Sequence, residues 1–329
     1  MISKERAIEI SKDVENGGFD IVAQMGGWSD ETLGRYLRLA NKTIADMAME
    51  ELKTATIKMP ERSTSTWLDG PKILSLDIET LPAHVRVWGL YKQRIPHKNI
   101  IKDWSMLSWA AKWIADDEIM GDVLCPEDAV AHDDSLLVEQ LWRLLDEADI
   151  VIAHNAKQFD IRKINARFQF NGIDVPPSPY QIIDTLIESR KVFAHTSHTQ
   201  DYLTKMLKLP KKLETDYQLW IDCDNGDETA LARMFEYNKG DIAGLEELYF
   251  KMRPWMRSHP NLGLYYDECD LSRCPKCGTK DLFWGDKYYY TPMGRYKSFR
   301  CNDCGSVGRD RKSDIAKEER EVLVSTVSR

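Results

Sequence analysis

The stretch ILSLDIET, residues 73–80, places two carboxylates within an almost continuously apolar run. A short apolar run that follows the turn residues Asp-Gly-Pro predicts a buried strand covered on both faces. Side chains two residues apart on a strand point to the same face, so Asp77 and Glu79 should project together. Burying them is costly unless they are paired or bind a metal ion. We therefore expect a metal-binding pair here; the alternative is a strand that ends in two solvated carboxylates.

Outward from this strand, the sequence shows further strand and helix patterns. Short apolar or alternating runs predict strands near residues 85–90, 106–114, 119–124 and 150–153, and helical periodicity predicts helices at 135–147, 161–170, 200–207 and 228–252. Asp227 can cap the last helix, and Pro254 can stop it. Strands followed by alternating helices and strands predict an α/β or α+β sheet with helices on its faces.

Two later segments carry further carboxylates. Asp160 ends HNAKQFD, residues 154–160, where a polar loop after the strand at 150–153 can bring it next to the first pair. Tyr237 and Asp241 are four residues apart and would share one face of the helix at 228–252. The alternatives are that Asp160 is a helix N-cap and that Tyr237 is a half-buried residue beside a solvated Asp241.

The carboxylates Asp77, Glu79, Asp160 and Asp241 would repel one another in a single cluster unless divalent cations neutralised them. Hard oxygen ligands without Cys or His favour Mg²⁺ or Mn²⁺. Two such ions can activate water and stabilise the leaving oxygen in phosphodiester hydrolysis. Tyr237 would then orient the attacking water.

The motifs LDIE, HN-x-x-x-FD and Y-x-x-x-D, in this order, resemble the three exonuclease motifs of the DEDD superfamily, tyrosine subtype. The resemblance spans about residues 72–254 and implies an RNase H-like fold, with 3′→5′ exonuclease activity that uses two Mg²⁺ or Mn²⁺ ions. It implies catalytic roles for Asp77, Glu79, Asp160, Tyr237 and Asp241. The fuller pattern, including VWGLY and PPSPYQIIDTL, looks most like stand-alone exonucleases of bacteriophage that work with polymerases. We expect a structural hydrogen bond, not catalysis, from Asp184.

The chain has seven cysteines, and four of them form two C-x-x-C pairs separated by 23 residues: Cys274, Cys277, Cys301 and Cys304. This spacing is typical of a zinc site. Four thiolates would make a closed, structural Zn²⁺ site, so the segment resembles a zinc ribbon. Cys269 is the nearest alternative ligand. Four unrelated reduced cysteines are the alternative interpretation.

Basic residues are concentrated in particular segments, although the chain of 329 residues has a formal net charge of −8. Residues 270–312 contain ten Lys or Arg, five Asp and many aromatic residues, a composition suited to single-stranded nucleic acid. In the N-terminal block, residues 19–42 resemble a helix-turn-helix, for which a plain helical bundle is the alternative. The candidate nucleic-acid-binding residues are Asn155, Arg35, Arg38, Lys42, Lys287, Arg295 and Lys297.

We therefore expect an α/β protein with an RNase H-like mixed sheet flanked by helices. The predicted parts are a small helical domain at 1–59, a linker at 60–70, the exonuclease domain at 71–262, a zinc ribbon at 269–312 and a loosely ordered charged tail at 313–329. No apolar stretch is long enough to span a bilayer and no signal peptide is evident, so we expect a cytoplasmic protein without a membrane partner.

The expected activity is hydrolysis of phosphodiester bonds at single-stranded or frayed DNA 3′ ends, in replication, proofreading or repair. The expected partners are DNA and a DNA polymerase or another replication protein. Two other functions fit the same residues. One is a 3′→5′ exoribonuclease, because the cleavage chemistry does not depend on the 2′-hydroxyl. The other is a non-catalytic DNA-binding adaptor, against which the complete set of four carboxylates and a tyrosine argues.

Overall fold

The computed structural model describes residue 12 and residues 70–92, 94–114, 116–209, 215–267 and 272–324. The chain divides into two compact units, Met1–Glu61 and Arg62–Arg329, and all described residues except residue 12 belong to the second. The predicted N-terminal helices, with Arg35, Arg38 and Lys42, lie outside the described residues, as does Cys269. The domain boundaries expected from the sequence stay predictions.

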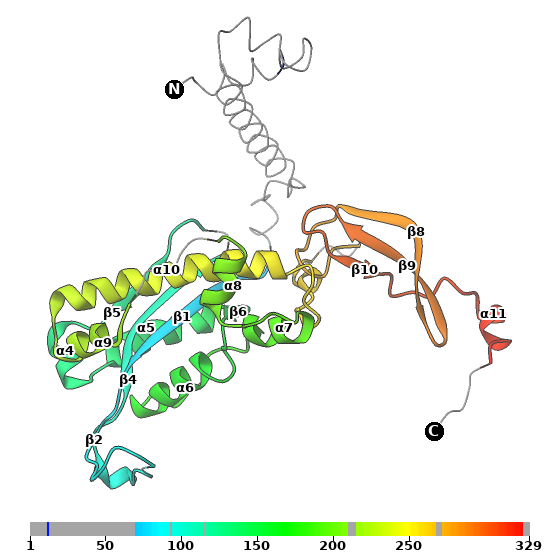
Figure 1. Ribbon diagram of the computed structural model, residues 1–329. Helices are drawn as coiled ribbons and strands as arrows, with labels where there is room; N and C mark the ends of the chain where they lie inside the picture. The colour runs from blue at the N-terminus through cyan, green and yellow to red at the C-terminus, as the bar shows by residue number, and fades with distance from the viewer. Residues whose placement is uncertain are drawn as a thin grey trace, which may run out of the picture. The chain divides into compact units, whose positions relative to one another are not determined.

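A five-stranded mixed sheet forms the centre of this unit, in the order β5-β4-β1-β6-β7 (Figure 1). β1 pairs antiparallel with β4 and parallel with β6; β4 pairs antiparallel with β5, and β6 pairs parallel with β7. This is the mixed α/β architecture of the RNase H-like fold. The strands are β1 (Ile73–Leu81), β4 (Ser105–Trp113), β5 (Met120–Val123), β6 (Ile150–Ala153) and β7 (Gln181–Asp184).

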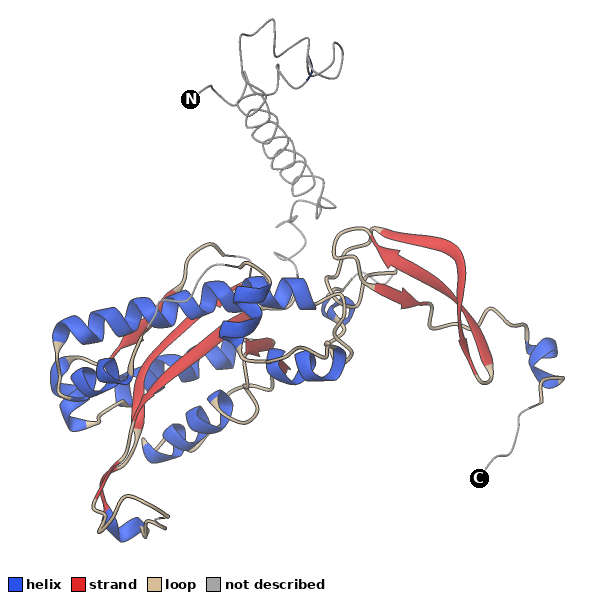
Figure 2. Ribbon diagram, viewed as in Figure 1, coloured by secondary structure: helices blue, strands red, loops and turns tan. Residues whose placement is uncertain are grey.

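Helices cover both faces of the sheet (Figure 2). Leu74, Leu76 and Ile78 of β1 share a core cluster with leucines of α5 (Ser135–Glu147) and with α6 (Asp160–Phe170). Ile73 joins a second cluster with Leu245 and other residues of α10 (Glu228–Met252). Asn238 of α10 hydrogen-bonds to Asp77 of β1, so Asp77 faces α10. Glu79, two residues further along the strand, faces the same side.

Shorter helices complete the structure around the sheet. Asp227 caps α10 as predicted, since the Ala230 amide donates to its Oδ1 at 2.8 Å. α10 ends at Met252, two residues before Pro254. The shorter helices of this part are α4 (Pro126–Ala131), α7 (Thr185–Val192), α8 (Gln200–Met206) and α9 (Tyr217–Asp224).

One predicted strand is wrong. Residues 85–90 do not continue as a strand beyond Val85, because only the two-residue β2 (His84–Val85) pairs, with β3 (Ile100–Lys102). The remaining residues of the predicted strand turn away from the sheet, and the Trp88 side chain is fully exposed. The sequence pattern of residues 85–90 resembles that of a strand. In the structure these residues belong to an exposed segment that extends from the end of the main sheet (Figure 1).

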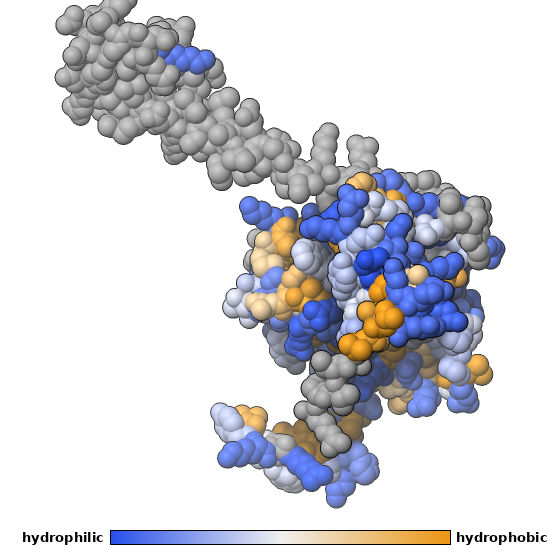
Figure 3. All heavy atoms as spheres, turned by 90° about the vertical axis from the view of Figure 1, so that its right-hand side faces the viewer, coloured by the Kyte–Doolittle hydropathy of each residue, from blue (hydrophilic) through white to orange (hydrophobic). Residues whose placement is uncertain are grey.

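The C-terminal part is a separate three-stranded antiparallel sheet, in the order β10-β9-β8. It follows the short helix η3 (Leu262–Tyr265), and a five-residue helix, α11, lies in the tail expected to be loosely ordered. The view in Figure 3 shows a largely hydrophilic surface with apolar side chains in small separate patches. The elements are β8 (Leu282–Thr291), β9 (Gly294–Cys301), β10 (Val307–Arg309) and α11 (Lys317–Glu321).

Candidate active site and metal centres

Three carboxylates converge where α10 crosses β1. One donor oxygen from each of Asp77, Glu79 and Asp241 lies within 4.8 Å of the others. Asp77 and Glu79 are half-buried on the same face of β1, whereas Asp241, on the buried side of α10, is 4% exposed. Three carboxylates at this separation repel one another unless a cation neutralises them, so the cluster fits a divalent metal ion.

Asp160 is the first residue of α6, after the loop that follows β6. The N-cap position belongs to Phe159, so Asp160 does not have the N-cap role of the alternative interpretation. Its side chain is 1% exposed, and its Oδ2 accepts no hydrogen bond from any described residue. The burial of an oxygen without a donor suits a cation ligand.

Asp160 lies against β1, where the backbone amide of Ile78 is near enough to its carboxylate to favour the charged form. The pairing of β6 with β1 ends at Ser75, which leaves this part of β1 open to another partner. Burial raises the pKa of Asp160 to about 7, the amides of Asp160 and Ile78 oppose that rise, and the Asp184 carboxylate adds to it. Asp160 is outside the group of three convergent carboxylates, although its carboxylate is close to the amide of Ile78, the residue between Asp77 and Glu79.

Tyr237 lies one turn before Asp241 on α10 and is 5% exposed. Its ring packs edge-on against Trp220 of α9, with 5.9 Å between ring centroids. The contact fixes the ring on the sheet-facing side of α10, which Asp241 also occupies. Packing therefore holds the Tyr237 ring in one position. A residue that orients a ligand must be held in this way.

Asn238, which the sequence analysis did not identify, connects the helix to two strands. Its Nδ2 donates to Asp77 Oδ2 at 2.6 Å, and its Oδ1 accepts from Ser108 Oγ of β4 at 3.1 Å. Asn238 is completely buried. It stands three residues before Asp241, a spacing that keeps it near the same helix face and that could have identified it.

Asp184 has the structural role expected of it. Its carboxylate caps α7 by accepting the Ile187 amide at 3.1 Å, and it also accepts the amides of Asn155 and Lys157 at 3.2 and 3.0 Å. These bonds hold the loop between β6 and α6. Asn155, a nucleic-acid-binding candidate, has a φ of 73°, so it occupies the left-handed conformation of that loop.

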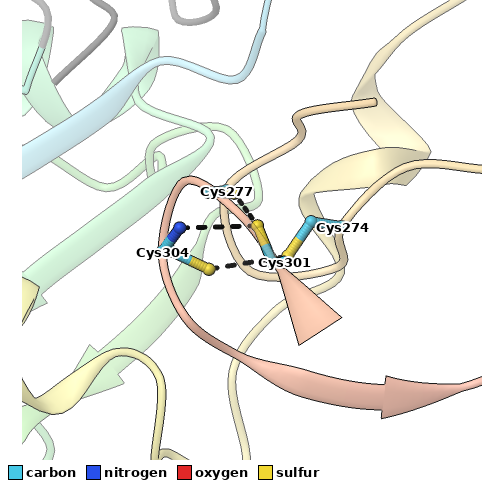
Figure 4. A group of neighbouring side chains, drawn as sticks. All are labelled: Cys274, Cys277, Cys301 and Cys304. Carbon is cyan, nitrogen blue, oxygen red and sulfur yellow. Dashed lines mark hydrogen bonds between the residues drawn. The ribbon is translucent and has the colours of Figure 1, made fainter. Parts of the chain in front are cut away.

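The four cysteines of the C-terminal part meet at one point between two turns (Figure 4). Cys274 Sγ lies 3.6 Å from Cys304 Sγ, and Cys277 Sγ lies 3.5 Å from Cys301 Sγ. A disulfide would need about 2.05 Å. Four thiolates bound to a tetrahedral zinc at about 2.3 Å would lie about 3.8 Å apart, so the arrangement fits such an ion.

The two cysteine turns share the same backbone hydrogen bond and the same glycine conformation. The Gly278 amide donates to the Cys274 carbonyl at 2.9 Å, and the Gly305 amide donates to the Cys301 carbonyl at 3.0 Å. Both glycines have positive φ, 78° and 74°, a conformation that other residues adopt only with strain. The glycine after each pair is therefore needed to fold the chain around the sulfur atoms.

The other basic candidates lie on the β8–β9 hairpin. Lys297 stands opposite Tyr288 and Arg295 opposite Tyr290, so these four side chains share one face, whereas Lys287 lies in the stretch where the register of the two strands shifts. Arg295 also pairs with Asp314 at 3.2 Å. Lys287 and Lys297 are exposed, so both cations are accessible to an anionic ligand.

A third group of possible metal ligands lies away from the carboxylates. Asp224, the last residue of α9, contacts His84 Nε2 of β2 at 2.5 Å and His132 Nε2 at 2.6 Å. His132 also contacts the Asp103 carbonyl through Nδ1 at 2.8 Å. The group joins the base of the segment around β2 to the helical body.

Residues 125–253 match the family model of the RNase_H superfamily. The matched region contains Asp160, Tyr237 and Asp241, whereas Asp77 and Glu79 precede it. No curated protein matches the chain significantly. The fold and the superfamily domain indicate a nuclease-type function and nucleic-acid binding. No helix in the described part of the chain is both long and apolar enough to cross a membrane.

Proposed function

We propose that this protein is a metal-dependent 3′→5′ exonuclease that hydrolyses phosphodiester bonds at single-stranded or frayed DNA 3′ ends. The observation that carries the proposal is the convergence of Asp77, Glu79 and Asp241 within 4.8 Å on the α10 face of β1. The order of the three sequence motifs and the superfamily match support it.

Asp77, Glu79, Asp160 and Asp241 would hold two Mg²⁺ or Mn²⁺ ions. When bound about 3.5–4 Å apart, such ions neutralise charge on the attacking and leaving oxygens. Asn238 fixes the Asp77 carboxylate through its hydrogen bond, and the Tyr237 hydroxyl would orient the attacking water. Tyr237 packs on Trp220 and Asp241 is buried, so that side of the site is shielded from bulk solvent.

We further assign a structural Zn²⁺ to Cys274, Cys277, Cys301 and Cys304, which makes the three-stranded sheet a zinc ribbon. The ribbon would contribute Lys287, Arg295 and Lys297 to nucleic-acid binding. The resemblance to stand-alone phage exonucleases adds a DNA polymerase or another replication protein as a partner at the same 3′ end, in the cytoplasm of the host cell.

The test is digestion of a 5′-labelled single-stranded DNA with Mg²⁺, Mn²⁺ or EDTA, beside matched RNA. We expect a metal-dependent ladder that shortens from the 3′ end. Asp77→Ala and Asp241→Ala should each lose at least about 10³-fold in rate, because the cations supply several kcal/mol of transition-state stabilisation.

Glu139→Gln is the matched control, because Glu139 is an exposed carboxylate of α5, whose leucines pack on the other face of the sheet. It should retain full activity. Cleavage of RNA but not DNA would show that the substrate is RNA and not DNA. Full activity of Asp77→Ala, or cleavage of neither substrate, would contradict the proposal.

A further inference from the structure

A basic arm joins β1 to β4. The arm, residues 82–102, contains five Lys or Arg and no Asp or Glu, in a chain whose formal net charge is −8. Its β2–β3 stem is a two-stranded sheet separate from the main one. A segment of 21 residues without one acidic group therefore presents a local positive potential on an acidic protein. The basic residues are Arg86, Lys92, Arg94, Lys98 and Lys102.

Most of these cations, and several apolar side chains, are accessible. Arg86, Lys92, Arg94 and Lys98 are exposed. Trp88 is 101% exposed, and Leu90 and Tyr91 are 86% and 87% exposed. A group of large exposed apolar side chains is typical of a surface that binds another molecule. Arg86, Trp88 and Lys98 also line a cleft of about 730 Å³, to which both sides of the stem contribute residues.

The base of the arm is attached to the protein body at two points. His84 contacts Asp224 of α9, which His132 also contacts. On the other strand, the Lys102 ammonium donates to the Val130 carbonyl of α4. His84 pairs with Lys102 across the stem, so both strands are fixed at the same level. The arm is thus held in place at its base.

The arm begins close to the candidate active site along the chain. His84 follows Glu79 by five residues, which span at most about 18 Å when fully extended. Glu79 lies on β1, which continues directly into the arm. A strand of nucleic acid whose 3′ end reached the carboxylates would therefore have its upstream nucleotides within reach of the arm.

We propose that the arm binds the single-stranded part of the nucleic-acid substrate, upstream of the 3′ end, with its exposed cations on phosphates and Trp88 stacked on a base. The proposal rests on the proposed function for the position of the 3′ end. Cations beside exposed aromatic rings are the groups that bind single strands without sequence preference. Protein interfaces are depleted of Lys, whereas the arm carries Lys92 and Lys98 beside its arginines, which argues for nucleic acid.

The test measures binding of a fluorescent 20-nucleotide oligothymidylate by anisotropy. Asp77→Ala serves as the parent so that no strand is cut. Adding Arg86→Ala, Lys92→Ala, Arg94→Ala and Lys98→Ala should weaken binding at least tenfold at low salt. It should also reduce the slope of log K against log salt by up to about 0.7 for each phosphate that the arm no longer neutralises. Adding Trp88→Ala alone should weaken binding about fivefold or more and leave the slope unchanged.

The control removes four exposed cations from elsewhere in the fold: Lys72, Arg143, Lys205 and Lys251. It changes the net charge equally, so retained affinity in this variant shows that position matters. Circular dichroism checks that every variant folds. Equal loss in the control and arm variants, or an arm variant that binds like its parent, would overturn the proposal. So would a parent that binds no oligonucleotide.

A kinetic comparison separates this proposal from the proposed function. With the carboxylates intact, the arm variant should show a KM raised at least tenfold on the 20-nucleotide strand and an unchanged kcat. Its kcat/KM on a dinucleotide, which has no upstream strand for the arm to bind, should equal that of the wild type. Oligonucleotide binding through the arm without any hydrolysis would contradict the exonuclease alone. Hydrolysis with no effect of the arm variant would contradict the arm alone.

Discussion

Asn238 Nδ2 of α10 donates to Asp77 Oδ2 of β1 at 2.6 Å, which couples the helix that carries Asp241 to the strand that carries the first carboxylate pair. The bond leaves only part of the Asp77 carboxylate available to a cation and fixes its rotation. A metal ligand held in this way is oriented before the ion arrives, and groups in that position commonly affect metal affinity by about 10–100-fold.

Asn238→Ala should therefore lower Mn²⁺ affinity about 10–100-fold and reduce kcat, because Asp77 loses its orientation. Calorimetric titration with Mn²⁺ and steady-state kinetics measure the two effects. Ser108→Ala is the control: it removes only the 3.1 Å bond to Asn238 Oδ1 and should have a smaller effect. An Asn238→Ala enzyme that folds and binds Mn²⁺ like the wild type would show that the bond serves stability alone.

Metal binding should depend on pH through Asp160. Burial raises the pKa of Asp160 to about 7, so below that pH the carboxyl is largely protonated and a cation must displace the proton. Affinity should rise up to about tenfold per pH unit as pH increases toward 7, and level off above it. Mn²⁺ titrations between pH 5.5 and 8.5 measure the profile. Asp160→Asn should bind more weakly and lose this dependence; a wild-type profile flat across the range would contradict the assignment.

Removal of one cysteine should abolish zinc binding at the C-terminal sheet. Cys274→Ser leaves three thiolates where a closed site needs four, and folding of such small units is coupled to the metal. We expect the zinc content to fall from about one equivalent to near zero by elemental analysis, with proteolysis appearing within residues 272–312. Cys125→Ser is the control, because Cys125 lies at the N-cap of α4, outside the cluster. Unchanged zinc content in Cys274→Ser would exclude the site.

A buried ion pair joins α6 to the start of α5. Arg167 of α6 donates to both oxygens of Asp134, at 2.6 and 2.7 Å, and the two side chains are 3% and 0% exposed. Removing one partner leaves the other charge buried without an opposite charge, which costs about 3–5 kcal/mol. Arg167→Met should therefore lower the free energy of unfolding by that amount in urea denaturation.

The double variant Arg167→Met with Asp134→Leu tests the reason for that loss. Replacing a buried pair by apolar residues is often close to neutral, but Asp134 also accepts the Met106 amide at 2.7 Å. We expect the double variant to recover part of the stability and to remain below the wild type. A double variant as destabilised as the sum of both single variants would show that the charge pair itself contributes nothing.

Local sequence was sufficient for most of the elements that carry the candidate site. The predicted helices at 135–147 and 228–252 and the strand at 150–153 have those bounds in the structure, because each contains a strong periodic pattern with recognisable ends. Residues 85–90 were assigned wrongly because a short apolar run cannot by itself show whether a neighbouring strand covers it. β7 and α9 were missed because both are short and weakly patterned.

By itself, the sequence determined how the candidate residues are grouped: Asp77 and Glu79 on one face of a strand, Tyr237 and Asp241 on one face of a helix, and four cysteines in two turns that each end in glycine. Those relations depend on spacing of a few residues, which helix and strand periodicity convert directly into geometry. Only the tertiary structure decided that α10 lies on β1, so that Asp241 meets the first pair and Asn238 bonds Asp77. It also decided that the apolar run after Glu79 is an exposed arm, because burial and long-range hydrogen bonds depend on residues distant in the chain.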